Sequence, residues 1–103
     1  MYNISGILLK GIKTMKAVIT VTGKDTVGII ANVSAKCAEY GANIVDISQS
    51  VLRDYFAMIM LVDIDHLSVH FTDFVDKMEL LGKESGLIIQ TMHEEIFQAM
   101  HTI

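Results

Sequence analysis

The sequence predicts an α+β domain in which two helices cover one face of a four-stranded antiparallel sheet. Runs of β-branched and apolar residues, typical of strands, are interrupted by two stretches with the spacing of amphipathic helices. The two middle strand-like runs are separated only by Arg53 and Asp54, so they should form an antiparallel hairpin. The resulting order, β-α-β-β-α-β, is that of the ferredoxin-like sandwich. A short extra helix is predicted at the C-terminus.

The first half of this unit comprises a strand, a glycine-containing loop and a helix. Residues 16–22 (KAVITVT) are rich in β-branched residues and alternate as a strand does. Over residues 27–40, apolar side chains recur at spacings of three and four, which predicts an amphipathic helix. Its predicted core residues are Ile30, Val33, Cys37 and Ala38. Gly41 follows as a residue able to take the left-handed conformation that ends helices.

The second half begins with the hairpin, whose strands span residues 43–52 and 55–63. In the first strand, the alternating Asp46, Ser48 and Ser50 give one polar face. The second strand is apolar on both faces. Its two rows are Phe56, Met58, Met60 and Val62, and Ala57, Ile59 and Leu61. Because such a strand is normally covered from both sides, we expect a partner subunit or the C-terminal helix to supply the second cover.

A second helix, a fourth strand and the terminal helix complete the unit. Ser68 is the predicted N-cap of the second helix, and Gly86 ends it. The predicted core stripe of this helix is Phe71, Phe74, Val75, Met78 and Leu81. Residues 87–92 (LIIQTM) form the fourth strand. Residues 94–103 begin with two glutamates, which suits the N-terminus of a short helix.

The first fifteen residues stand outside this pattern. Their apolar segment, residues 7–9, is too short for the core of a signal peptide or for a membrane span. We therefore expect residues 1–15 to be an N-terminal extension, disordered or arising from an upstream start codon, without a share in the core. The alternative is an added strand or helix used in self-association. Residues 16–103 are then a single domain.

Composition and charge exclude several classes of function. With 103 residues, 51% of them apolar and 19% charged, the chain is long enough for one core and is not intrinsically disordered. The net charge is −4 and the lysines are scattered, so we expect neither direct nucleic-acid binding nor a membrane partner. The single cysteine, Cys37, cannot form a disulfide within the chain and fits a reducing, cytoplasmic compartment.

The residues needed for catalysis or metal binding are not brought together by any motif. Acylphosphatase-type chemistry on this fold needs an arginine in the first strand–helix loop, whereas the only arginine is Arg53 in the hairpin. Metal carriers need paired cysteines in that loop, and Cys37 is alone. His66 and His70 would share a helical face only if the helix began before the predicted cap. We therefore expect no enzyme activity, no metal and no cofactor.

The loop between the first strand and the first helix is the candidate ligand site, together with the start of the second strand. Its residues are Gly23, Lys24, Asp25, Thr26, Val27, Gly28 and Asn43. A zwitterion could place its carboxylate on backbone N–H groups of residues 26–28 and its ammonium on Asp25 or the Asn43 carbonyl. Alternatively, the glycines only permit the turn, and Asp25 or Thr26 caps the helix. Spacing alone favours the second interpretation.

This stretch, VTGKDTVGIIANVSAKCAEYGANIVDISQS, resembles an ACT domain, the small-molecule-binding regulatory module of many enzymes of amino-acid metabolism. The resemblance covers Lys16 to about Met92. The stretches DISQSVLRDYFAMIMLVD and HEEIFQAMH are similar to stand-alone ACT proteins, which resemble one half of the two-ACT glycine cleavage system repressors. The resemblance implies dimerisation through sheet or helix edges, with an amino acid bound at the interface.

Position by position, the resemblance assigns the ligand loop to Gly23, Lys24, Asp25 and Gly28, with Asn43 opening the second strand. Val27 stands where many ligand-binding ACT domains have proline, so the identity of the amino acid does not transfer. We expect a non-catalytic, homodimeric regulatory module that binds a small amino acid and acts in trans on an unidentified protein partner. The alternative is a ligand-free dimerisation or adaptor protein.

Overall fold

The computed structural model describes residues 2–3, 6–8, 15–24 and 27–101. Its main sheet has the strand order β4-β5-β3-β6, and every neighbouring pair is antiparallel. The strands are β3 (Lys16–Lys24), β4 (Asn43–Leu52), β5 (Tyr55–Asp63) and β6 (Leu87–His93). The predicted hairpin is therefore present as β4 and β5, and β4 and β6 are the edge strands of this sheet.

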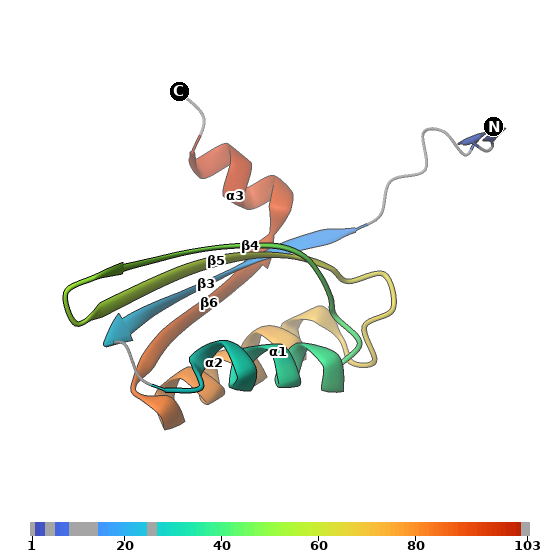
Figure 1. Ribbon diagram of the computed structural model, residues 1–103. Coiled ribbons are helices and arrows are strands. Elements are labelled where there is room, and N and C mark those ends of the chain that lie inside the picture. The colour runs from blue at the N-terminus through green and yellow to red at the C-terminus, as the bar shows by residue number, and fades with distance from the viewer. Residues whose placement is uncertain (1, 4–5, 9–14, 25–26, 102–103) are drawn as a thin grey trace.

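Helices lie on both sides of the sheet. Figure 1 shows α1 (Ile29–Glu39) and α2 (Phe71–Ser85) side by side against one face, whereas α3 (Glu94–Met100) rises from the opposite face. Because α3 begins directly after β6, the chain leaves the sheet without a loop. The predicted ferredoxin-like fold, with two helices on one face and an extra C-terminal helix, is confirmed.

Met15 precedes β3 and is hydrogen-bonded to the segment that follows β5. Its N–H donates to Oδ1 of Asp65, its carbonyl accepts from the N–H of Ile64, and both distances are 2.9 Å. Two short strands, β1 (Tyr2–Asn3) and β2 (Gly6–Leu8), pair with each other in parallel and apart from the main sheet (Figure 1). Residues 1, 4–5 and 9–14 lie outside the described residues, so the role of the predicted extension stays a prediction.

The core lies between the sheet and the two covering helices. Alternate residues of β3 and β5 face these helices and are buried: Ala17, Ile19, Val21, Phe56, Met58, Met60 and Val62. Of the two apolar rows predicted for β5, the row that begins at Phe56 is therefore the inner one. From α2, Phe74 and Met78 are fully buried, while Phe71, Val75 and Leu81 lie half-buried at the flanks of the predicted stripe.

The buried stripe of α1 differs from the predicted one. Ile29, Val33 and Cys37 are buried, whereas Ile30 is 38% exposed and Ala38 is exposed. The helix begins at Ile29, two residues later than predicted, and its buried residues follow a strict four-residue spacing. Ile30 lies about 100° around the helix from Ile29 and therefore points out of the core.

The predicted N-cap of α2 is also wrong. The cap is His70, and the helix begins at Phe71. Ser68 lies in the preceding loop, where its N–H and its hydroxyl both donate to the carbonyl oxygen of Tyr40, at 2.8 and 3.2 Å. Since Tyr40 ends α1, Ser68 satisfies a helix C-terminal carbonyl rather than a helix N-terminus.

Candidate functional site

The predicted ligand loop is shorter than expected, because β3 continues through Gly23 and Lys24. Gly23 pairs with Phe56 on one side and Leu87 on the other, and Lys24 pairs with Tyr55. The placement of these two residues in a loop was therefore wrong. The side chain of Lys24 is exposed at the end of the strand.

Gly23 has a packing role at this strand end. A Cβ atom there would lie 2.7 Å from Cδ2 of Leu87 and 3.3 Å from the carbonyl oxygen of Gly86. A larger residue at this position would need the Leu87 side chain to move, so glycine favours the close start of β6 beside β3. Gly23 is therefore explained by the fold, independently of any ligand.

Gly28 is the N-cap of α1 and has a left-handed backbone with φ of 87°. Its carbonyl accepts the first helical hydrogen bond, from the N–H of Asn32 at 2.9 Å, and it has no side chain to cap the first turn. The N–H groups of the first turn have no acceptor within a helix, so they are suited to an anion. Val27 beside them is fully exposed. Asp25 and Thr26 lie outside the described residues, so capping or ligand binding by them stays a prediction.

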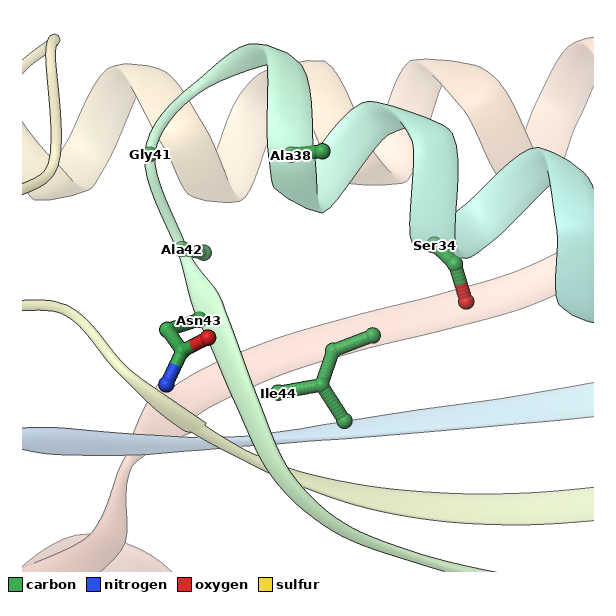
Figure 2. A pocket seen from close by; sticks show the side chains of 6 residues that line it. All are labelled: Ser34, Ala38, Gly41, Ala42, Asn43 and Ile44. Carbon is green, nitrogen blue, oxygen red and sulfur yellow. The ribbon is translucent and has the colours of Figure 1, made fainter.

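Asn43 lines a hollow at the opposite end of α1. The hollow has a volume of about 390 Å³ and lies between α1 and the first residues of β4 (Figure 2). Its lining residues are Ser34, Ala38, Gly41, Ala42, Asn43 and Ile44. Figure 2 shows the Ser34 hydroxyl pointing from the helix toward the sheet, and the exposed Asn43 amide at the start of β4.

The hollow opens at an edge of the sheet. Within the described residues, β4 pairs with β5 alone, so its outer edge carries unpaired N–H and C=O groups. A bulge interrupts its pairing between Ile44 and Asp46, and the extra residue, Val45, is 50% exposed. The predicted polar face is present on this strand, since Asp46, Ser48 and Ser50 are all exposed.

Gly28 and Asn43 lie at opposite ends of α1. They are separated by the 11 residues of α1, a length of roughly 16 Å at 1.5 Å per residue. The site residues that the structure describes therefore form two half-sites: residues 23–24 and 27–28 precede the helix, and Asn43 follows it. Ser34 was not among the site residues predicted from the sequence. The signal for it was the pair of small residues Ser34 and Ala38, one turn apart beside an edge strand.

A sequence model of the ACT domain matches residues 16–92 of this chain. The chain belongs to the ACT domain family. The UPF0237 protein of Methanopyrus kandleri is 44% identical over 88 residues, which cover 85% of this chain and 98% of that protein. The UPF0237 protein of Listeria innocua is 45% identical over 89 residues, which cover 86% and 100%. The predicted resemblance is confirmed.

Solved structures agree with this assignment. An ACT domain protein from Streptococcus pneumoniae has a TM-score of 0.73 and 44% identity, covering 84% of this chain and 97% of that one. A protein assigned as a glycine cleavage system transcriptional repressor has a TM-score of 0.65 and 28% identity. That match covers 78% of this chain and 46% of the repressor, so this ACT domain resembles one half of it, as predicted.

Titratable groups in this ACT domain do not form a reactive centre in the described residues. Burial raises the pKa of the Cys37 thiol to about 11, so the thiol stays protonated and unreactive near neutral pH. His66 and His70 are exposed. Among the residues that the structure describes, no three His, Cys, Asp or Glu side chains are placed to hold a metal ion. None of the described helices is long and apolar enough to cross a bilayer.

Proposed function

We propose that this ACT domain is a non-catalytic regulatory module that binds a small amino acid at a homodimer interface and acts in trans on a protein partner. The hollow beside Asn43 carries the proposal. Its volume of about 390 Å³ lies at the lower end of the range of small-molecule sites, about 300–1,000 Å³. Its lining has no charged side chain, so recognition relies on an amide, a hydroxyl and backbone groups.

The two half-sites come together when a second copy lies along the outer edge of β4. A two-fold axis at this edge makes the two β4 strands antiparallel. The helix α1 of one copy then runs opposite to that of its neighbour. The first-turn N–H groups after Gly28 in one copy therefore approach Asn43 in the other. They bind the carboxylate, aided by the positive end of the helix dipole, and the Asn43 side-chain carbonyl accepts from the ammonium.

The remaining loop residues surround this ligand. Asp25 supplies a second acceptor for the ammonium, Thr26 and Val27 contribute backbone N–H groups, and Lys24 lies at the strand end. The free, buried Cys37 agrees with a reducing, cytoplasmic setting, which belongs to the same proposal. Residues 16–103 form the binding module, and residues 1–15 precede it as an extension.

A second candidate is a ligand-free dimerisation or adaptor protein. The observation that favours it is that Gly23, at the end of β3, and Gly28, before α1, each have a structural reason to be glycine. Gly23 allows the close approach of β6, and Gly28 allows a left-handed N-cap. Neither residue then requires a ligand.

Thermal-shift and calorimetric screening against the twenty amino acids separates the two candidates. An amino acid present at a hundred times its Kd should stabilise the protein by about 2.7 kcal/mol. The regulatory proposal expects such a shift for one or a few small amino acids. If none of the twenty shifts the melting temperature at millimolar concentration, the amino-acid proposal fails and the adaptor candidate stands.

A further inference from the structure

The sheet face opposite α1 and α2, called the open face below, is only partly covered, and it carries exposed apolar side chains beside the polar row of β4. Its exposed residues include Tyr55 (59%), Ile59 (47%) and Ile88 (65%). At one end, α3 lies against β3 and β6, and there Val18 is only 4% exposed. The terminal helix therefore covers part of β3 and β6 at one end of the open face. Tyr55 and Ile59 of β5 stay exposed, so the second cover expected for β5 is left to a partner subunit.

The helix α3 itself has an apolar side that faces solvent. Ile96 and Met100 are four residues apart and lie on one side of the helix, where they are 53% and 63% exposed. No residue of α3 is buried. Figure 1 shows the helix rising from the sheet rather than lying flat on it. It forms an apolar ridge above one end of the open face.

The other end of the open face holds a hollow of about 380 Å³, called the sheet hollow below. It is lined by Thr22, Gly23, Ser50, Leu52, Tyr55, Phe56 and Ala57, most of which point to the open face by strand alternation. Thr22 lies five residues along β3 from Ala17, which pairs with His93 just before α3. At about 3.4 Å per residue, roughly 17 Å separates the ridge from the hollow.

The charges at the two ends are complementary. The first turn of α3 carries Glu94 and Glu95. The end of the sheet with the hollow carries the exposed side chains of Lys24 and Arg53. Asp54, next to Arg53, offsets one of these two positive charges. Within one chain these groups are at opposite ends of the sheet, so they cannot pair with each other.

We propose that the open face is an interface between two copies of this chain, in which α3 of each copy inserts Ile96 and Met100 into the sheet hollow of the other. Each copy carries one ridge and one sheet hollow. A two-fold axis between the copies therefore places the ridge of each copy in the sheet hollow of the other. The same axis brings the glutamates of α3 toward Lys24 of the neighbouring copy. This interface lies on a sheet face and is distinct from the β4 edge, so both can form in one assembly.

Cross-linking between differently labelled copies tests the contact. Copies carrying Ile96→Cys are mixed with copies carrying Ala57→Cys, which lies in the sheet hollow, and treated with a short bismaleimide. Cys37 is buried with a raised pKa and does not compete. The matched control pairs Ile96→Cys with Leu80→Cys, a residue of α2 that is 54% exposed on the opposite side. At least a tenfold excess of mixed dimer over this control is expected, and the absence of an excess overturns the proposal.

The mass of the assembly gives a second test with the full chain. Light scattering should show that Ile96→Glu halves the number of copies in the wild-type assembly, whereas Leu80→Glu leaves it unchanged. An unchanged mass for a folded Ile96→Glu variant refutes the interface, as does a wild-type mass of 11.4 kDa, that of one chain. If Ile96→Glu fails to fold, the cross-linking result decides alone.

Discussion

The carbonyl oxygen of Tyr40 accepts two hydrogen bonds from Ser68, one from its backbone N–H at 2.8 Å and one from its hydroxyl at 3.2 Å. These bonds join the end of α1 to the loop that leads into α2, across 28 residues of sequence. They fix the turn from which β4 and Asn43 start.

The hydroxyl of Ser68 should therefore stabilise the domain as a donor and not as a helix cap. Ser68→Ala should lower the free energy of unfolding by about 0.5–1.5 kcal/mol, measured by urea denaturation. Ser68→Thr keeps the donor and should restore most of that loss. Ser68→Asp keeps a good capping side chain but removes the donor, so it should be as destabilising as alanine. Recovery of stability by aspartate would show that the residue acts as a cap after all.

Gly82 lies within α2, where alanine would ordinarily stabilise the helix by about 1 kcal/mol. Here a Cβ atom would be 2.8 Å from the carbonyl oxygen of Leu87 and 3.0 Å from Cγ1 of Ile89. Backbone shifts of this kind cost about 1–3 kcal/mol. We expect Gly82→Ala to be net destabilising by about 1–2 kcal/mol in chemical denaturation. An increase in stability would mean that β6 moves away at little cost.

The order of elements and the buried rows of the strands could be predicted because they depend on local periodicity. The inner row of β5 and the core stripe of α2 follow directly from alternation and helical spacing. Errors arose where a distant residue decides the outcome. Glycine at position 23 indicates a turn locally, but pairing with Phe56 and Leu87 extends β3 through it. Serine at position 68 indicates a helix cap from its local sequence, but in the fold its hydroxyl donates to the carbonyl oxygen of Tyr40.

The candidate site was harder to predict than the fold. Asn43 was proposed from the element order and from the resemblance, whereas Ser34 was not, because a serine within a helix gives no signal until the neighbouring strand is placed. The element order did indicate that the first loop and the start of the second strand need not lie together in one copy and can meet across a side-by-side dimer. Spacing along a chain does not say which residues meet across two copies.

The hairpin turn contains a strained residue. Arg53 has a positive φ of 56°, a conformation that costs a non-glycine residue about 1 kcal/mol. Two-residue hairpins prefer glycine at this position. Arg53→Gly should therefore raise the free energy of unfolding by up to about 1 kcal/mol. The matched change Asp54→Gly, at a position without positive φ, should give no gain. Equal effects of the two changes would contradict this assignment of strain.

Cys37 makes the stability of the domain depend on pH in the alkaline range. Its pKa is raised by burial from 9.0 to about 11 in the folded state. Above pH 9 the unfolded chain releases the thiol proton while the folded chain retains it, so stability falls as pH rises from 9 to 11. Each unit of pKa difference corresponds to about 1.4 kcal/mol. Denaturation curves at pH 8 to 11 should show that the free energy of unfolding falls less steeply with pH in Cys37→Ala than in the wild type. Equal slopes for the two proteins would refute the role of burial.

Asn43 is the residue whose replacement most directly tests the shared amino-acid site. Since its exposed side chain makes no core contact in the hollow, Asn43→Ala should leave the fold and the number of copies unchanged. It should abolish the thermal shift produced by whichever amino acid stabilises the wild type, and Asp25→Ala should do the same. Gln90→Ala removes an exposed amide from the opposite edge strand and should keep the shift. Loss of the dimer in Asn43→Ala would assign this residue a structural role, and a retained shift would move the ligand elsewhere.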